Sequence, residues 1–398
     1  MRVLIVNYEY PPVGGGAATA AEGIAKALIQ LGHRVVVMTG RFKDQAKSCQ
    51  ENGVDIHRIP SLRRAIDRCS MWEMMSFLCA GLIFGPAIIK KYRIEAAIVF
   101  FSLPCGPIGF LGRRLYGVPY VVSLRGGDVP GAEPSLRWIH SLLRPIRRAV
   151  LKNSVAVVAN SEGLRKMAEA ADPLQVQLIP NGVDTIRFVP PPLKPARNEN
   201  VLRILFVGRF QNQKNLPFLL KQVAKLQPST FELHLVGDGP LRKSLRDLAN
   251  ELGIAESTAW HGWVSRAALR DLYQWADCLV NPSLYEGMSN VVLEAMASGL
   301  PVVASNVPGN RSLVVDGQTG FLIELDHPSG AVPALTQLYD TNTRLRLGEN
   351  ARRRVVQFFS WETGASQYIE LLSGRGLSTN RTSVSVIELK EEKRRNWR

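Results

Sequence analysis

The chain has 398 residues, 46% of them hydrophobic, and a formal net charge of +15. This length fits two domains, and the composition is that of a globular protein rather than of a disordered or collagen-like chain. The five cysteines are scattered and form no C-x-x-C pair, which argues against a disulfide framework or a zinc site and favours reduced thiols in the cytosol.

The N-terminus, Met1–Val6, runs directly into an apolar strand pattern without the basic and apolar regions of a signal peptide. The longest apolar stretch, Met74–Ile89, has 16 residues and contains Gly81, Gly85 and Pro86. A helix that spans a membrane needs about 20 apolar residues. We therefore expect a cytoplasmic protein in which this stretch forms a core or interfacial helix.

The first half of the chain alternates short apolar runs with helical patterns, which predicts a parallel sheet covered on both faces. The expected strands are Val3–Asn7, Arg34–Thr39, Ala96–Phe101, Tyr120–Leu124 and Ser154–Ala159. The expected helices are Thr19–Leu31, Met71–Lys91, Cys105–Tyr116, Ser135–Lys152 and Glu162–Ala170. We assign residues 1–190 to this first α/β domain.

A proline-rich stretch, Pro190–Asn200, lacks periodicity and predicts a linker. After it the same alternation restarts. The expected strands are Arg203–Val207, Glu232–Val236, Thr258–His261, Cys278–Asn281 and Pro301–Ala304, with helices that begin at Leu216, Pro240, Arg266 and Asn290. We assign residues 191–360 to a second α/β domain, 361–374 to a last helix, and the polar, basic residues 375–398 to a disordered tail.

The positive charge lies mainly in the first domain, where residues 1–190 contain 24 Lys/Arg and 14 Asp/Glu. A basic surface attracts nucleic acid, anionic lipid or phosphorylated small molecules. In the segment Leu62–Arg93, cations stand at both ends of an apolar stretch that contains Trp72. This pattern is typical of an interfacial helix on anionic lipid. The alternative is a helix buried on the sheet with solvated charges at its ends.

Two glutamates eight residues apart stand on either side of a predicted helix start. Glu286 follows a strand, and Glu294 lies in the second turn of the next helix. The N–H groups of Met288, Ser289 and Asn290 open that helix, and a helix N-terminus attracts phosphate. This layout suits a nucleotide sugar, with the amides on the pyrophosphate and the carboxylates on sugar and ribose hydroxyls. The alternative is a surface helix with ordinary acids.

Two further strand ends carry candidate ligand-binding residues. Arg209 and Lys214 follow the strand that ends at Val207, and two cations there can neutralise a departing nucleoside diphosphate. Gly237 and Gly239 follow the next strand and permit the backbone to approach a ligand closely. The alternatives are a solvated basic loop and an ordinary turn between strand and helix.

Three consecutive glycines, Gly14–Gly16, separate the first strand from the first helix and predict a mobile loop over phosphates or acceptor. They are no dinucleotide fingerprint, because Thr19 stands where the third glycine is required. The sequence contains neither a G-K-[ST] phosphate loop nor a D-x-D pair, so we expect no metal held in that way.

Taken together, these segments resemble the family 4 retaining GT-B glycosyltransferases over about residues 1–372. The signatures that carry the resemblance are Gly14–Gly16, Pro180–Asp184, Val207–Arg209 with Lys214, Gly237–Pro240, His261–Val264 and the two-glutamate segment Asn281–Met296. The resemblance implies two Rossmann-like α/β/α domains that face each other across a cleft, with the last helix crossing back to the first domain.

The resemblance also implies roles for individual residues of the second domain. Arg209 and Lys214 correspond to the pair that binds the donor pyrophosphate. Glu286 corresponds to the carboxylate that faces the donor sugar, and Glu294 to the ligand of the ribose.

Three further positions receive a role from the same resemblance. Trp263 and Val264 fall where the family holds the nucleobase, and the Gly15–Gly16 loop falls where the family covers the phosphates and the acceptor. One departure concerns the loop after Tyr120–Leu124, where the family usually has a histidine and this chain has Arg125. This puts in doubt any catalytic role assigned to a histidine; Arg125 replaces it or is only a surface ion-pair partner.

The expected function is therefore retaining transfer of a sugar from a nucleotide-sugar donor to a sugar or lipid-linked acceptor, in polysaccharide or glycolipid assembly. No metal or cofactor besides the donor is expected, and the expected location is cytoplasmic, with contact to an anionic membrane surface if Leu62–Arg93 is the interfacial helix. One alternative is a nucleotide-sugar epimerase of the same architecture. The other is a non-enzymatic nucleic-acid binder, although the basic residues are dispersed and lack interleaved aromatics.

Overall fold

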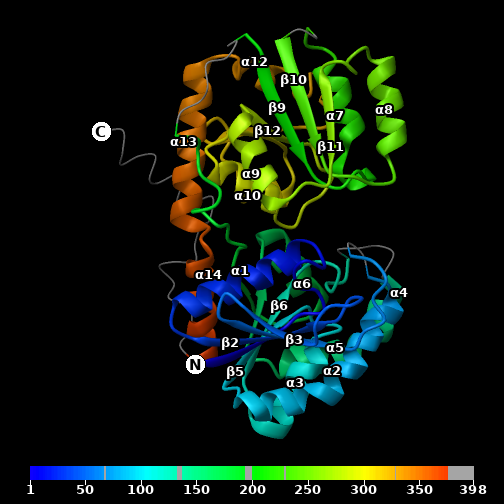
Figure 1. The fold of residues 1–398 in the computed structure, drawn as a ribbon, viewed down its shortest axis with the longest axis vertical. Helices are drawn as coiled ribbons and strands as arrows, with labels where there is room; N and C mark the ends of the chain where they lie inside the picture. The colour runs from blue at the N-terminus through cyan, green and yellow to red at the C-terminus, as the bar shows by residue number, and fades with distance from the viewer. Residues whose placement is uncertain (67–68, 132–136, 193–199, 228–229, 328, 375–398) are drawn as a thin grey trace. The chain divides into compact units, whose positions relative to one another are not determined.

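The computed structural model describes residues 1–66, 69–131, 137–192, 200–227, 230–327 and 329–374. It divides into two compact units (Figure 1). The first comprises Met1–Asn160, Leu164–Pro180 and the last helix from Glu362, and the second comprises Ser161–Gly163 and Asn181–Trp361. The expected tail 375–398 and most of the expected linker lie outside the described residues.

The first unit is built on an eight-stranded sheet of order β3-β4-β2-β1-β5-β6-β7-β8. Its strands are β1 (Arg2–Val6), β2 (Arg34–Gly40), β3 (Ser48–Glu51), β4 (Val54–Ile59), β5 (Ala96–Phe100), β6 (Tyr120–Leu124), β7 (Ala156–Ala159) and β8 (Val176–Leu178). Val3 of β1 pairs with Val35 and Ala96 on its two sides. All pairings are parallel except the hairpin β3–β4.

Helices cover both faces of this sheet, as the alternating pattern predicted. They are α1 (Gly16–Gln30), α2 (Met71–Tyr92), α3 (Gly106–Tyr116), α4 (Arg137–Leu142), α5 (Arg144–Lys152), α6 (Glu162–Ala171) and α14 (Trp361–Leu372). Figure 1 shows α2, α3 and α5 together on one side of the sheet, with α1 and α6 on the other. The last helix therefore returns to the first unit, where Tyr368 bonds Ser123 of β6 (Oη to Oγ, 2.7 Å).

The second unit is built on a six-stranded sheet of order β11-β10-β9-β12-β13-β14. Its strands, all parallel, are β9 (Leu202–Val207), β10 (Phe231–Val236), β11 (Thr258–Gly262), β12 (Cys278–Asn281), β13 (Val302–Ser305) and β14 (Gly320–Ile323). Its helices are η2 (Asn212–Lys214), α7 (Leu216–Val223), α8 (Arg242–Glu251), α9 (Arg266–Trp275), α10 (Asn290–Ala297), α11 (Pro308–Arg311), α12 (Val332–Gln337) and α13 (Thr341–Phe358).

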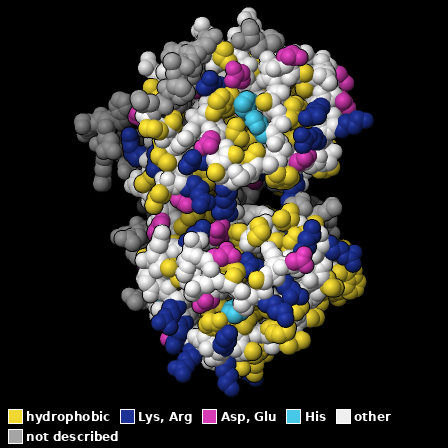
Figure 2. Space-filling model, in the orientation of Figure 1, with side chains coloured by type: hydrophobic (Ala, Val, Ile, Leu, Met, Phe, Trp, Pro, Cys, Tyr) yellow, Lys and Arg dark blue, Asp and Glu magenta, His cyan; other side chains and the backbone are white. Residues whose placement is uncertain are grey.

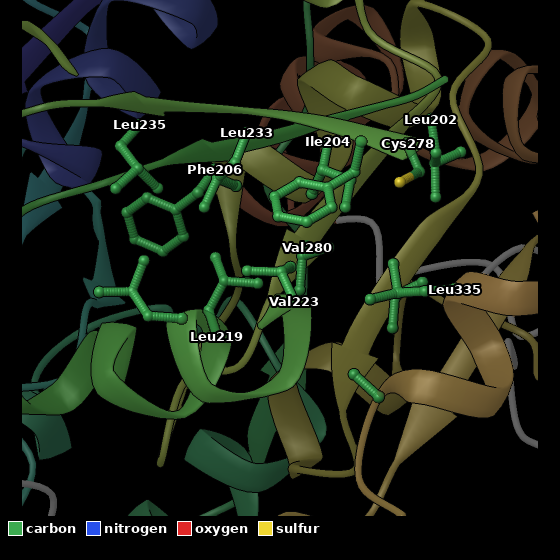
Figure 3. Packing of buried hydrophobic residues seen from close by; sticks show 14 of the residues in the cluster. Leu202, Ile204, Phe206, Leu219, Val223, Leu233, Leu235, Cys278, Val280 and Leu335 are labelled. Carbon is green, nitrogen blue, oxygen red and sulfur yellow. The ribbon is translucent and has the colours of Figure 1, made fainter. Parts of the chain in front are cut away.

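Successive residues of the central strand β9 supply the two cores of this unit. Ile204 and Phe206 enter the core beneath α7, where Figure 3 shows them with Leu219 and Val223. Leu205 enters the core on the opposite face with the helix α10. Because neighbouring side chains of a strand point to opposite faces, a continuous apolar run is the signature of a strand buried on both sides.

The first unit ends at Pro180, so the boundary predicted at 190 moves ten residues toward the N-terminus. Val183 and Phe188 are buried in a core of the second unit. Val183 also donates its N–H to the carbonyl of Phe359 (2.9 Å). These contacts attach residues 181–190 to the second unit before the proline-rich stretch begins.

Two predictions about helices are corrected by the structure. The single helix expected over Ser135–Lys152 is broken at Leu143, between α4 and α5. The reason is Pro145, which has no N–H to donate to the preceding turn. The glycine run expected to be a loop contributes Gly16 as the first residue of α1.

Candidate functional site

The central candidate site lies at the carboxyl ends of β9 and β12 in the second unit. The strand β9 comes first in this unit, yet it lies between β10 and β12, so the order of the sheet reverses there. Open α/β sheets bind ligands at such a switch point, outside the carboxyl ends of the strands. The loops that leave β9 and β12 carry Arg209, Lys214 and Glu286.

The structure brings Lys214 and Glu286 into direct contact. The Lys214 Nζ lies 2.5 Å from Oε1 of Glu286, and the side chains are 16% and 8% exposed. A Cβ added at Gly208 would lie 3.2 Å from Cζ of Phe206 and at an ordinary 3.5 Å from Cε of Lys214. The lysine stem therefore passes beside the glycine of the predicted Val207–Arg209 signature at the end of β9.

Hydrogen bonds from neighbouring hydroxyl and amide groups fix the side chain of Glu286. Ser283 Oγ lies 2.8 Å from the same Oε1 and 2.6 Å from Oδ1 of Asn281, and its one hydrogen serves one of them at a time. Asn281 in turn donates to Oγ of Ser289 (3.0 Å). Ser289 is the N-cap residue of α10 and makes no side-chain cap bond to that helix.

Residues from neighbouring loops, which the sequence analysis did not select, hold this network in place. Gln213 donates to the carbonyl of Tyr285 (2.9 Å), and Ser305 donates to the carbonyl of Ser283. Gly309 lies against the loop from the other side, since a Cβ there would approach the carbonyl oxygen of Glu286 to 2.4 Å. The Pro308-Gly309 dipeptide, which begins α11 after β13, was the sequence signal for a close backbone contact here.

Gly237 and Gly239 must lack a side chain because neighbouring backbone atoms lie too close for a Cβ. A Cβ at Gly237 would lie 2.0 Å from the carbonyl oxygen of Gly208, and one at Gly239 would lie 2.4 Å from that of Phe210. Phe210 N–H also bonds the carbonyl of Asp238 (2.9 Å). The backbone that closely approaches Gly237 and Gly239 is therefore the loop that carries Arg209. The Arg209 side chain is half-buried at the end of β9.

The helix α10 supports the second glutamate and its N-terminal residues. Glu294 is half-buried and accepts a hydrogen bond from the Tyr273 hydroxyl (3.0 Å). Burial raises the pKa of Glu294 to about 7, while the Tyr273 hydrogen bond and the charges of Arg266 and Arg187 oppose this shift. The carboxyl group therefore changes its charge near neutral pH.

The first turn of α10 is joined to the segment that enters this unit. Met288 Sδ accepts the N–H of Asn181 (3.0 Å), and the side chain of Asn181 donates to Oδ1 of Asn290 (2.9 Å). Trp263 and Val264 follow β11 at the edge of the sheet, where the Trp263 indole is 65% exposed and Val264 packs on the core. An exposed indole offers a ring face for stacking.

The first unit holds the remaining candidates in a separate group. The Glu9 carboxylate accepts the N–H of Gly15 (2.9 Å) at the start of α1, and Gly14 donates its N–H to the carbonyl of Ile66 (2.8 Å). Gly14 has a φ of +106°, which favours glycine. A side chain at Gly15 would meet no atom within 4 Å, so the glycine loop is open on one side.

Arg125 is half-buried in the loop after β6. Its guanidinium carbon lies 4.3 Å from the ring centroid of Phe100, and its side chain bonds that of Tyr368. Burial lowers the pKa of Arg125, and Tyr368 and Asp128 counteract this shift. The Asp128 carboxylate accepts the N–H groups of Ser102, Arg125 and Gly126, which fixes the loop after β6.

Comparison with known proteins assigns the chain to a family. The model described as Glycosyl transferase 4-like domain matches residues 15–182, and the model described as Glycosyl transferases group 1 matches residues 202–341. The chain belongs to the family 4 glycosyltransferases. The matched ranges correspond to the two units, and the assignment confirms the resemblance seen in the sequence.

Two relatives illustrate the range of this transferase family. An uncharacterized glycosyltransferase of Methanocaldococcus jannaschii is 26% identical over 93% of this chain and 97% of its own. The UDP-Gal:alpha-D-GlcNAc-diphosphoundecaprenol alpha-1,3-galactosyltransferase of Escherichia coli is 29% identical over 69% of this chain and 73% of its own.

Solved structures confirm the fold as GT-B. Sucrose-phosphate synthase from Thermosynechococcus elongatus superimposes with a TM-score of 0.78 at 23% identity, over 94% of this chain and 98% of that chain. The Anabaena protein HepE, in complex with UDP and glucose, superimposes with a TM-score of 0.72 at 19% identity, over 94% of this chain and all of that chain. The family supports a transferase and does not favour the epimerase alternative.

Proposed function

We propose that this glycosyltransferase moves a hexose or a related sugar from a nucleotide sugar to a sugar or lipid-linked acceptor, with retention of configuration and without a metal. The observation that carries the proposal is the half-buried Lys214–Glu286 pair at the switch point of the second sheet, with Glu294 in the following helix α10. The relatives that act on a diphosphoundecaprenol sugar or bind UDP and glucose give the substrate classes.

In this proposal the bond from the anomeric carbon to the nucleoside diphosphate breaks, and the acceptor oxygen forms its bond on the same face. Negative charge develops on the leaving diphosphate, where Arg209, Lys214 and the N-terminal turn of α10 stabilise it. Glu286 holds the donor sugar, Glu294 binds the ribose, and Trp263 stacks on the base. The acceptor proton leaves with the diphosphate oxygen, so the reaction needs no other reactant.

The first unit supplies the acceptor side in this proposal. The Gly15–Gly16 loop contacts the acceptor, and the Arg125 cation stands where the family has a histidine. Two cations and a helix terminus do the work that a metal performs in other transferases, which supports metal independence. The free cysteines of the described residues agree with a cytoplasmic location.

The test is nucleoside diphosphate release from a panel of nucleotide sugars, measured with and without lipid-linked sugars as acceptors. Release should require an acceptor, and NMR of the product should show the anomeric configuration of the donor. Conversion of a donor to its epimer without acceptor would contradict the proposal, and an inverted product would contradict the retaining mechanism.

Metal independence has its own measurement. Release should persist after exhaustive chelation, because Arg209 and Lys214 carry the positive charge that the leaving group needs. Complete loss of activity that manganese or magnesium restores would show that a metal takes part.

A further inference from the structure

The helix α2 has two apolar sides, and only one of them is covered. One side packs on the first unit through residues spaced three or four apart: Phe77, Gly81, Gly85 and Ile88. The opposite side is exposed to solvent along its length: Trp72 (81%), Met75 (41%), Leu82 (36%) and Ile83 (71%). Among the described residues, α2 alone is long and apolar enough to cross a membrane by length and composition.

The covered side attaches α2 firmly to the unit and makes spanning incompatible with this fold. A Cβ at Gly81 would lie 2.2 Å from Cδ1 of Ile108 in α3, and one at Gly112 of α3 would lie 2.8 Å from Cδ1 of Ile89. Close packing of this kind leaves only the outer side of α2 for a partner.

A second row of exposed apolar side chains lies on α4 and α5. Trp138, Leu142 and Ile146 recur every four residues and are 67%, 68% and 48% exposed. Large apolar patches on a protein surface mark sites of protein or membrane interaction. Figure 2 shows hydrophobic and cationic side chains together over the part of the first unit where Figure 1 draws α2, α3 and α4.

Positive charge lies at one end of the α2 surface. The glycine contacts align α2 and α3 in parallel, so their C-terminal ends lie side by side. These ends carry five exposed cations: Lys90, Lys91, Arg93, Arg113 and Arg114. Glu95, two residues after Arg93, pairs with Arg2, and Glu73 is buried in the capping box at the opposite end of α2.

We propose that the outer side of α2, with the cationic ends of α2 and α3, docks on the surface of an anionic lipid bilayer. Aromatic and aliphatic side chains beside lysine and arginine are what a helix in the lipid headgroup region requires. A second copy of the chain fits less well, because its own α2 surface would bring five more cations to the contact instead of opposite charge. The docking does not depend on the sugar donor.

The sequence also places three cations before α2, namely Arg63, Arg64 and Arg68. Arg63 is 8% exposed and donates to the carbonyl oxygens of Ala65 and Ile66, and Arg68 lies outside the described residues. Arg64 is exposed, so the described residues place one exposed cation before α2 and five at the C-terminal ends of α2 and α3.

The experiment is co-sedimentation of the full chain with vesicles of phosphatidylcholine alone or of phosphatidylcholine mixed with the anionic lipid phosphatidylglycerol. Binding should require phosphatidylglycerol and weaken at high salt. Trp72→Ser with Ile83→Ser should lower partitioning at least about tenfold, because two apolar side chains no longer enter the headgroup region. Lys90→Ser with Arg114→Ser should lower it roughly 25-fold, at about fivefold per cation.

Matched controls come from exposed residues of the second unit. Leu345→Ser with Val356→Ser and Lys221→Ser with Lys243→Ser remove the same kinds of side chain and should bind vesicles like the wild type. Equal binding to both vesicle types, no binding, or equal losses in the controls would overturn the proposal. A wild-type dimer that becomes monomeric in the Trp72/Ile83 variant and never sediments with vesicles would identify a second copy as the occupant.

Discussion

At the scale of single residues, the proposed ribose ligand Glu294 should couple nucleotide binding to pH. Burial raises the pKa of its carboxyl group to about 7, and the ionised form is the better acceptor for ribose hydroxyls. Affinity for a nucleotide sugar should therefore fall as pH drops below 7, by up to about tenfold per pH unit. Calorimetric titration between pH 6 and 8 measures this slope. Glu294→Gln should bind weakly with no slope, while Glu286→Gln should retain the slope.

The same carboxyl group should lower the stability of the fold at neutral pH. Its pKa is raised in the folded state, so its ionisation opposes folding as pH rises from 4.5 toward 7, and the penalty is complete above 7. Glu294→Gln should therefore raise the free energy of unfolding by about 1–3 kcal/mol at pH 8 and leave it unchanged at pH 4. Urea unfolding of the wild type and of Glu294→Gln at both pH values measures this difference. An equal change in the free energy of unfolding at pH 4 and pH 8 would contradict the raised pKa.

Lys214 and Glu286 should act as a coupled pair. Their atoms are 2.5 Å apart, and removal of either leaves the other half-buried without this partner. We expect Lys214→Ala and Glu286→Ala each to cost transfer about 2–4 kcal/mol, and the double variant to lose at least about 1 kcal/mol less than the sum. As a control, Lys214→Ala combined with Glu256→Ala, which changes an exposed acid, should be additive in kcat/KM. Full additivity of the first pair would show that the contact is absent in the working enzyme.

At the scale of helices and strands, three glycines of α3 determine how the first unit packs. Cβ atoms at Gly106, Gly109 and Gly112 would meet Val150, Val99 and Ile89 at 2.5–2.8 Å. Gly109→Ala should destabilise the protein by about 1–3 kcal/mol, although alanine is the better helix former. Gly364→Ala in α14 is the control, because its Cβ finds ordinary contacts at 3.6 Å and should be neutral or stabilising. Thermal unfolding of both variants distinguishes strain from propensity.

Alternation of strand and helix predicted the strands β1, β2, β5, β6 and β7 because each is a run of apolar residues. It missed the hairpin β3–β4, whose first strand is polar and mostly exposed. The Asn52-Gly53 dipeptide was the available signal, since its φ angles of +51° and +80° are those of a type I′ hairpin turn. Polar edge strands give little hydrophobic periodicity, so only their turn chemistry identifies them.

At the scale of the whole molecule, the sequence predicted which residues carry charge at the strand ends but not which of them meet. The motif spacing identified Lys214 and Glu286 separately, 72 residues apart. Their contact depends on the reversal of strand order beside β9, which no local pattern contains. Ser305 and Tyr273 were missed for the same reason, because their hydrogen bonds join segments that only the folded sheet brings together.

The division into units likewise required the structure. Composition indicated the proline-rich stretch near residue 190 as the boundary, whereas the burial of Val183 and Phe188 sets it at residue 180. The sequence shows a linker by its lack of hydrophobic periodicity. The domain boundary depends instead on which side chains are buried in each unit, and this requires the structure. The last helix was predicted correctly, since Tyr368 of α14 is fully buried in the first unit.

The most direct test of the account is nucleoside diphosphate release by Glu286→Gln, measured with the best nucleotide-sugar donor and acceptor. The account predicts a fall in kcat of about 100–1,000-fold, with nucleotide affinity within about threefold of the wild type. The control Glu256→Gln, which changes an exposed acid of the same unit, should leave both quantities unchanged. Turnover near the wild-type rate in Glu286→Gln would contradict the assignment of the Lys214–Glu286 pair as the centre of the reaction.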